Sequence, residues 1–600
     1  MSAPARPRIL LWTILGIALA LRLAHWWAIR GEPFFVQLAM DSQEYDRWAQ
    51  EIAGGDWLGS QVFFQAPLYP YLLATVYTVA GRSLDAVYLL QIAAAVAGIW
   101  ALYRAARGMA GERAGLVAAG LAAVYGPFLF YDAQLLKESF AVTVTCFLLW
   151  ALAARRWLAA GLLLGLLALF RENALLLVPF LLPLAWRREQ KTTGLLRAGG
   201  ALVLGLTLAL APVALRNGHV GGDFLPTTFQ GGVNFWIGNN PQADGTYQPI
   251  VPGKQIPALE RQEPVRVAEQ ELGRPLTPAE VSSHWLGKAL AWAAGHPGAF
   301  LRLQLRKLGM FWSWYEWPDA VDYYWVQGLS PVYRLPLVEF GTVSLLALAG
   351  LWLVRKDPKP FAPALLFALG WMLSTVVFFL FSRYRLPVVP ALLPLAAVPL
   401  VRLGEAFRER RRGWRTGAGL IAAAFLLPHL PWFEPRMDLV HYNLGRLAEE
   451  RGDPAAAHGH YKAAFLLDPK SFLACMNLGN LAARQRDWPT ALRFYQRAEA
   501  IEPRSDDVAS NIGGVWLALG DLDQAERSLD RALALNPQNL TALHNKALLR
   551  ARSGDLDGAR ELNRRLLEIA PENPAGLRLR ERLNSAAAPP AAPATAGTRR

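Results

Sequence analysis

Long apolar runs recur through the first 430 residues and constrain the fold of this chain more than any other feature. A helix needs about 20 apolar residues to cross ~30 Å of hydrocarbon, and several runs reach or approach that length. Hydrophobic residues make up 53% of the chain, which is too apolar for a soluble protein. After about residue 438 the pattern becomes that of soluble amphipathic helices, so we predict an all-α chain with a membrane domain over 1–437. The clearest runs are residues 9–28, 84–103, 195–215, 361–381 and 416–430.

Positive charge between the apolar runs sets the expected topology. Much of the net charge of +14 lies in short loops such as 408–415 (RERRRGWR), as the positive-inside rule requires, and it gives no reason to expect a nucleic-acid partner. We place Arg6 and Arg8 in the cytoplasm and expect the short segment 67–80 to be re-entrant or interfacial rather than spanning. About eleven helices then cross, plus or minus two. The other basic clusters then fall on the same side: Arg104, Arg107 and Arg113; Arg155 and Arg156; Arg187, Arg188 and Lys191; Arg355, Lys356 and Lys359.

The same topology collects polar segments on the opposite, extracytoplasmic face of a plasma (inner) membrane. Polar groups at membrane depth are costly to bury and are usually functional. An odd number of crossings also places the C-terminal part outside the cytoplasm. An aromatic cluster at 312–317 (WSWYEW) fits an interfacial belt, with sugar stacking as the alternative. The collected segments are residues 30–65, 131–139, the turn at Arg171, 382–385 and a large loop at about 216–336.

The C-terminal part contains four units at a spacing of 34 residues, which is the period of tetratricopeptide repeats. We predict an α-solenoid over 438–584 whose concave surface binds a partner or acceptor, with packing against catalytic loops as the alternative. Asn563 stands where earlier units carry Tyr461, Tyr495 and Leu529, as in a polar cap. Residues 585–600 are predicted to be disordered. The register is marked by Pro469, Pro503, Pro537 and Pro571, and by Ala457, Ala491, Ala525 and Ala559.

An acidic, tyrosine-containing segment directly follows the first apolar run. Residues 40–71 read MDSQEYDRWAQEIAGGDWLGSQVFFQAPLYPY. Here the sequence resembles the C-type glycosyltransferases of the protein O-mannosyltransferase and aminoarabinose transferase group. It departs from them at Ala66, where the family has proline, and at Gln65, where some members carry a phosphate-binding lysine. Further segments that look like family features are 135–140 (LLKESF), 169–176 (LFRENALL), 234–241 (NFWIGNNP) and 383–387 (RYRLP).

The resemblance implies transfer of a sugar from a polyprenyl-phosphate donor to a protein, lipid or glycan acceptor, with inversion. Asp41 occupies the place of the family's first loop aspartate and is the predicted base that takes the acceptor proton. Asp46 and Glu138 are further catalytic candidates. The alternatives are that the two aspartates are solvated loop charges, and that Glu138 pairs with Lys137. A divalent metal held by Asp132 and Glu138 also stays open, and no other cofactor is expected.

Cations are expected to neutralise the leaving lipid phosphate, and the guanidinium fork of arginine suits this role. Arg171, Arg383, Arg385 and Lys137 lie on the same face as the predicted base, and we predict that they bind the donor phosphate. Alternatively, Arg171 forms a helix-end pair with Glu172, and the other two arginines extend to the membrane interface.

Two other classes of function remain open. A polysaccharide polymerase or ligase also combines many membrane helices with a large external loop, and a non-catalytic scaffold would use the repeats to recruit envelope assembly factors. The acidic motif directly after the first helix favours a glycosyltransferase over a polymerase. The combination of Asp41 with clustered arginines argues against a scaffold.

Overall fold

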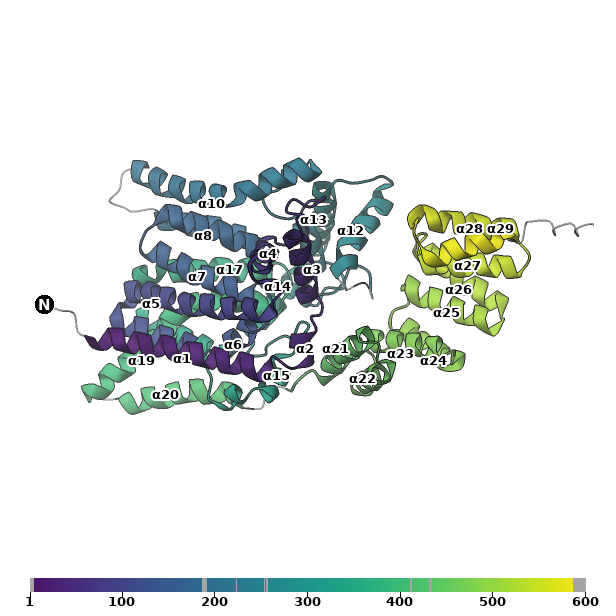
Figure 1. The fold of residues 1–600 in the computed structure, drawn as a ribbon. Coiled ribbons are helices and arrows are strands. Elements are labelled where there is room, and N and C mark those ends of the chain that lie inside the picture. Colours follow the sequence, from purple (N-terminus) through teal and green to yellow (C-terminus); the bar gives the residue numbers. More distant parts are fainter. Residues whose placement is uncertain are drawn as a thin grey trace, which may run out of the picture. The chain divides into compact units, whose positions relative to one another are not determined.

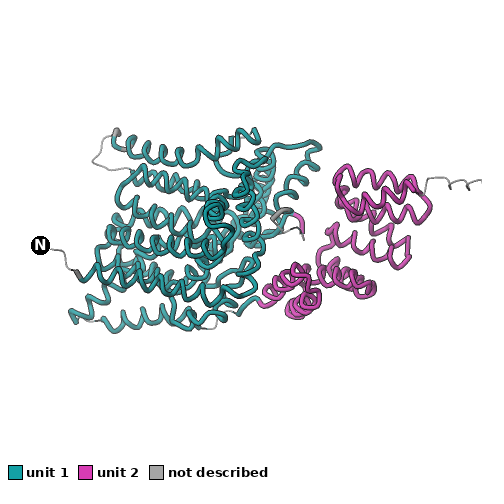
Figure 2. The backbone as a smooth tube through the Cα atoms, in the orientation of Figure 1, with its two compact units in different colours: residues 1–250, 254–436 teal, residues 251–253, 437–600 magenta. Residues whose placement is uncertain are grey.

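The chain folds into helices throughout its described residues, which confirms the all-α prediction. The computed structural model describes residues 5–185, 192–222, 224–252, 254, 257–410, 413–430 and 434–585. Apart from an isolated bridge between Tyr125 and Val338, these residues contain no β structure. They form two compact units, one of residues 1–250 and 254–436 and the other of 251–253 and 437–600 (Figure 2).

Long apolar helices of the first unit lie side by side in a bundle (Figure 1). Helix α5 packs against α1, α7 and α19, and α8 packs against α7 and α10. The bundle is therefore continuous from the first helix to the last. Its members are α1 (Ala5–Ile29), α5 (Leu84–Ala123), α7 (Glu138–Ala153), α8 (Trp157–Phe170), α10 (Thr192–Gly221), α16 (Phe340–Val354), α17 (Ala362–Val376), α19 (Val389–Arg408) and α20 (Trp414–Leu426).

Five helical segments among the described residues are long and apolar enough to cross a bilayer. They are Arg6–Ile29, Leu84–Ala123, Leu196–Gly221, Lys359–Val376 and Ser382–Arg408. Shorter apolar helices add to them: Leu68–Ala80, Glu138–Ala153, Trp157–Phe170, Glu172–Ala185 and Phe340–Val354. The chain thus has the helices of a membrane protein, while the number of about eleven crossings stays a prediction.

Helix α5 is a hairpin rather than one straight rod. A straight helix of its 40 residues would be about 60 Å long, roughly twice the thickness of a hydrocarbon core. Gly111 has a φ of 84° inside it, and a Cβ on Gly115 would lie 3.0 Å from the Tyr103 carbonyl oxygen. The chain therefore folds back at Gly111, beside the basic residues that we expect at a cytoplasmic turn.

Shorter helices gather at one end of the bundle (Figure 1). The predicted loop 216–336 is largely helical, and α10 continues into it as far as Gly221. A capping box between Thr277 and Glu280 fixes the start of α13, because each side chain satisfies a backbone donor of the first turn. The helices at this end are α2 (Pro33–Val36), α3 (Asp41–Ala53), α4 (Leu68–Ala80), α11 (Gly231–Gly238), α12 (Pro257–Leu272), α13 (Pro278–Gly295), α14 (Pro297–Trp312) and α15 (Tyr323–Leu329).

Several short elements connect the bundle to this end. They lie singly or in series between the longer helices, so together they set where the loop side chains lie. They are α6 (Gly126–Asp132), η1 (Glu172–Leu177), α9 (Val178–Leu181), η2 (Leu182–Ala185), η3 (Pro331–Arg334), η4 (Lys359–Phe361), α18 (Ser382–Arg385), η5 (Leu386–Val388) and η6 (Leu427–His429).

The second unit is the predicted solenoid of paired helices. An aspartate caps the second helix of every repeat, at Asp453, Asp487, Asp521 and Asp555, because its carboxylate accepts an N–H that the helix leaves free. A Cβ on Gly479 would lie 2.6 Å from Tyr495, so glycine permits the close approach of the paired helices. The helices are α21 (Met437–Glu450), α22 (Pro454–Leu467), α23 (Phe472–Arg484), α24 (Trp488–Ile501), α25 (Asp506–Leu519), α26 (Leu522–Leu535), α27 (Leu540–Arg552), α28 (Leu556–Ile569) and α29 (Pro574–Ser585).

The last repeat differs from our prediction of a polar cap. Asn563 is buried, and its side chain donates to the Gly576 carbonyl at 3.0 Å. Helix α29 therefore covers this repeat, and the polar side chain is needed to satisfy the backbone of α29. The predicted tail beyond Ser585 and the basic residues Arg187, Arg188, Lys191, Arg411 and Arg412 lie outside the described residues.

Candidate functional site

A cavity of about 230 Å³ opens among side chains of the first unit. All five family-like segments contribute to its walls, although they are far apart in the sequence. The 40–71 segment supplies Asp41, Tyr45 and Gln65. The other segments supply Lys137 from 135–140, Arg171, Glu172 and Asn173 from 169–176, Asn234 from 234–241, and Arg383 and Tyr384 from 383–387.

Asp41 lies at the start of α3, where Met40 turns the chain with a φ of 54°. Its carboxylate is 2.8 Å from Nη1 of Arg383, and Nη2 of Arg383 is 3.0 Å from the Asp319 carboxylate. Burial by itself would raise the pKa of Asp41, but Arg383, Lys137 and Arg171 outweigh it and the pKa is lowered. Asp41 is therefore ionised at neutral pH and able to accept a proton.

Asp319 is a site residue that the sequence did not reveal. It lies just after the aromatic cluster 312–317, which we interpreted as an interfacial belt. Burial raises the pKa of Asp319, while Arg383 opposes that shift. Its carboxylate meets the second arm of the Arg383 guanidinium, while Asp41 meets the first.

A second acidic side chain of the cavity wall, Glu260, also escaped sequence reasoning. It extends from α12 and accepts a hydrogen bond from the Tyr247 hydroxyl. Burial raises the pKa of Glu260 to about 7. In the sequence, Glu260 stands in a stretch rich in charged residues, and that pattern does not point to a site.

Two further cations line the cavity beside Arg383. Arg171 donates to Glu138, and its guanidinium lies 4.4 Å from the centroid of the Tyr384 ring. The side chain of Lys137 makes no hydrogen bond or ion pair with the described residues, and its Nζ lies 5.8 Å from the Tyr45 ring centroid. Burial and then Arg171 lower the pKa of Lys137 to about 7. The cavity thus holds three basic groups and the ionised Asp41, together with the carboxyl side chains of Glu172, Glu260 and Asp319.

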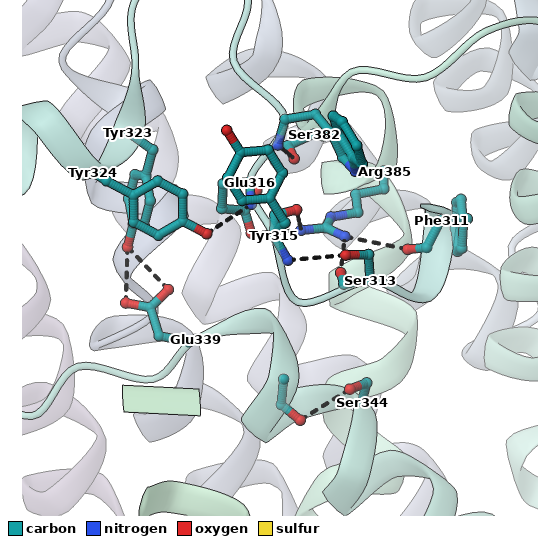
Figure 3. A network of polar contacts seen from close by, with 12 residues as sticks. Phe311, Ser313, Tyr315, Glu316, Tyr323, Tyr324, Glu339, Ser344, Ser382 and Arg385 are labelled. Atoms are coloured by element: carbon teal, nitrogen blue, oxygen red, sulfur yellow. Dashed lines mark hydrogen bonds and ion pairs between the residues drawn. The ribbon is translucent and has the colours of Figure 1, made fainter. Parts of the chain in front are cut away.

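Arg385 does not share this cavity, which differs from our prediction. Its guanidinium is 2% exposed and points into the turn that follows α14 (Figure 3). There it donates to the carbonyls of Phe311, Ser313 and Tyr315, and it pairs with Glu316 at 2.7 Å. Both terminal nitrogens of its guanidinium bind this turn, so the contacts of Arg385 fit a role in holding the turn in place.

Asp46 also has structural partners of its own. Its carboxylate accepts from the Tyr77 hydroxyl at 2.7 Å and pairs with Arg82 at 2.9 Å. These contacts tie α3 to the end of α4 and the loop before α5. Asp46 is not among the residues that line the cavity, so its position fits a role in holding α3.

Glu138 and Asp132 each face an arginine. Glu138 pairs with Arg171 rather than with Lys137. Asp132 lies 2.7 Å from Arg22 and accepts from the Ser139 hydroxyl at 2.6 Å. Among the described residues no group of three or more His, Cys, Asp or Glu side chains is arranged to hold a metal ion.

The cavity brings basic side chains close to a carboxylate, and part of this unit is similar to a known family. Residues 65–215 match the dolichyl-phosphate-mannose-protein mannosyltransferase family. This segment carries Gln65, Lys137, Arg171 and Glu172 of the cavity wall, and the family is one of membrane glycosyltransferases. The predicted resemblance is confirmed for these residues.

Residues 442–506 and 517–574 match the tetratricopeptide repeat family, which confirms the predicted repeats and indicates a protein-interaction module. No curated protein matches the chain.

Similar solved structures are tetratricopeptide proteins. A thermophilic one from Thermus thermophilus is 26% identical, and the match covers 32% of this chain and 97% of that chain with a TM-score of 0.22. YrrB, described as having an unusual peptide-binding site, is 14% identical over 39% of this chain and 99% of its own, with a TM-score of 0.22. The MamA protein is 20% identical, and the match covers 25% of this chain and 87% of that chain with a TM-score of 0.22.

Proposed function

We propose that this protein is an inverting glycosyltransferase that moves a sugar from a polyprenyl-phosphate donor to an acceptor hydroxyl. The observation that carries the proposal is the meeting of ionised Asp41 with Arg383, Arg171 and Lys137 in one cavity. A carboxylate is the base that such a transfer needs, and clustered cations are what a leaving phosphate needs. The family match supports mannose as the first sugar to test.

The reaction follows from these positions. The acceptor hydroxyl attacks the anomeric carbon of the sugar while its proton passes to Asp41. The bond from that carbon to the phosphate oxygen breaks, and the electron pair leaves on the lipid phosphate. Because the sugar carbon develops positive charge and the phosphate gains negative charge, fixed cations near the phosphate stabilise the transition state more than the bound donor.

Arg383 couples donor binding to the base. Without donor its guanidinium divides between Asp41 and Asp319. A phosphate oxygen that takes the Nη1 side would release Asp41 and raise its basicity, while Asp319 keeps the arginine in place. The base would then become strongest when the donor is bound.

We further propose that the reaction takes place on the outer face of the plasma (inner) membrane and that the repeats lie on the same side. The positive loops and the odd number of predicted crossings support this sidedness. The repeats would then bind an exported acceptor or an assembly partner.

The decisive experiment uses the full-length protein, purified and reconstituted in lipid, with a radiolabelled mannosyl polyprenyl phosphate. We expect release or transfer of labelled sugar, and loss of that activity in Asp41→Asn. Trp57→Ala is a matched control, because Trp57 is 47% exposed and outside the cavity wall. If no sugar in a panel of lipid-linked donors is turned over in a way that depends on Asp41, the protein is not such a transferase, and a scaffold is favoured.

A further inference from the structure

A second cavity lies next to the candidate active site and has a different chemistry. It measures about 410 Å³ and is formed by α3, residues 56 and 59–65, the end of α10 and the start of α12. Gln65 lines both cavities. The side-chain oxygen of Gln65 is buried and has no hydrogen-bond partner among the described residues. A ligand hydroxyl between the two cavities would satisfy it.

The charges around the second cavity balance one another. Three carboxylates and three guanidinium groups face it: Glu44, Glu51 and Asp56, and Arg47, Arg216 and Arg261. Arg47 pairs with Glu44 at 2.5 Å and also with Glu51. Such a surface has many donors and acceptors but no net charge, so it favours a polar and uncharged ligand over an anion or a cation.

Aromatic side chains stand among these polar groups. Trp48 is half-buried in the wall, with its ring centroid 5.4 Å from that of Phe63. Ser60, Gln61 and Gln262 add uncharged polar groups. Hydroxyl-binding side chains beside an indole face match the two surfaces of a sugar ring, whose hydroxyls point outward and whose C–H groups form an apolar face.

Two backbone carbonyls in and beside this cavity already have partners. The carbonyls of Leu58 and Gln61 each accept from Arg216 at 2.7 Å. An extended peptide binds mainly through main-chain hydrogen bonds, and these acceptors are already occupied. Arg261, by contrast, is half-buried and its side chain makes no hydrogen bond or ion pair with a described residue, so its guanidinium can donate to a ligand.

We propose that the second cavity binds the acceptor and that the acceptor is an uncharged glycan, whose reacting hydroxyl reaches Asp41 past Gln65. This inference rests on the proposed function, because it assigns the acceptor of that same reaction. It also accounts for the balanced charge of the second cavity, because the acceptor brings hydroxyls and no charge.

The test uses full-length protein in nanodiscs and two photoreactive probes, an uncharged mannotriose and a serine- and threonine-rich peptide. We expect the mannotriose to label the walls of the second cavity in a saturable way. Trp48→Ala and Arg261→Ala should each weaken labelling roughly threefold to tenfold, as expected for one lost aromatic or hydrogen-bond contact. Trp57→Ala should leave it unchanged, and thermal melting of each variant checks that the protein is folded.

The two proposals fail in different ways. Saturable labelling by the peptide instead of the glycan, or glycan labelling that both folded variants leave unchanged, would overturn the acceptor assignment. If the glycan fails to label while release of donor sugar still depends on Asp41, the acceptor class alone is wrong. Asp41→Asn should keep glycan labelling, because Asp41 does not line the second cavity.

Discussion

Replacing Asp41 by asparagine tests the chemistry most directly, because the change removes the charge and keeps the shape. Arg383 retains Asp319 at 3.0 Å, so the variant should fold and insert. A lost general base lowers the rate by about 10²–10⁴-fold, which is roughly 3–5 kcal/mol of transition-state stabilisation. Donor affinity should be equal or higher, because Asp41 no longer competes with the phosphate for Arg383.

The assay is initial-rate transfer from a radiolabelled mannosyl polyprenyl phosphate at saturating donor, with donor binding measured separately on the same preparation. We expect a fall in kcat without a rise in the donor Kd. Activity within a few-fold of the unmodified protein would refute Asp41 as the base. A large loss of donor affinity with little change in kcat would show instead that Asp41 serves only to position Arg383.

The remaining predictions address the donor cations and the topology. Because burial lowers the pKa of Lys137 to about 7, Lys137 is charged below that pH and neutral above it. Donor affinity should therefore fall as the pH rises through 7; the charges that surround Lys137 are Asp41, Glu172, Arg171 and Arg383. Lys137→Arg should remove this pH dependence. If the variant keeps the pH profile of the unmodified protein, Lys137 does not bind the donor phosphate. Arg383→Ala should weaken donor binding, with only partial rescue by lysine. Arg385→Ala should lower the melting temperature, because a broken buried pair costs about 3–5 kcal/mol. If the variant keeps its melting temperature and loses only donor binding, Arg385 binds the donor and does not hold the turn. A cysteine at exposed Ser553, in a background without the buried native cysteines, should react with an impermeant thiol reagent on intact spheroplasts. Labelling only after lysis would place the repeats inside.

The sequence by itself determined the class of fold and the repeats. Both are local properties: apolar runs of membrane length require helices, and a 34-residue period in which Ala457 and its three equivalents stay small requires paired helices. The family-like segments also pointed to Asp41, Lys137, Arg171 and Arg383 through their residue patterns alone. These were recognisable because each lies in a short segment with its own pattern.

Only the tertiary structure decided which of these side chains meet. Arg383 and Arg385 look equivalent in sequence. Residues two apart on a helix, however, are rotated by roughly 200° about the helix axis and therefore point to nearly opposite sides. One therefore faces the cavity while the other enters the turn at Glu316. Sequence spacing gives that angle but does not say which side is the cavity. Asp319 illustrates the same limit, since only the packing of the 312–322 turn against α18 brings its carboxylate to Arg383.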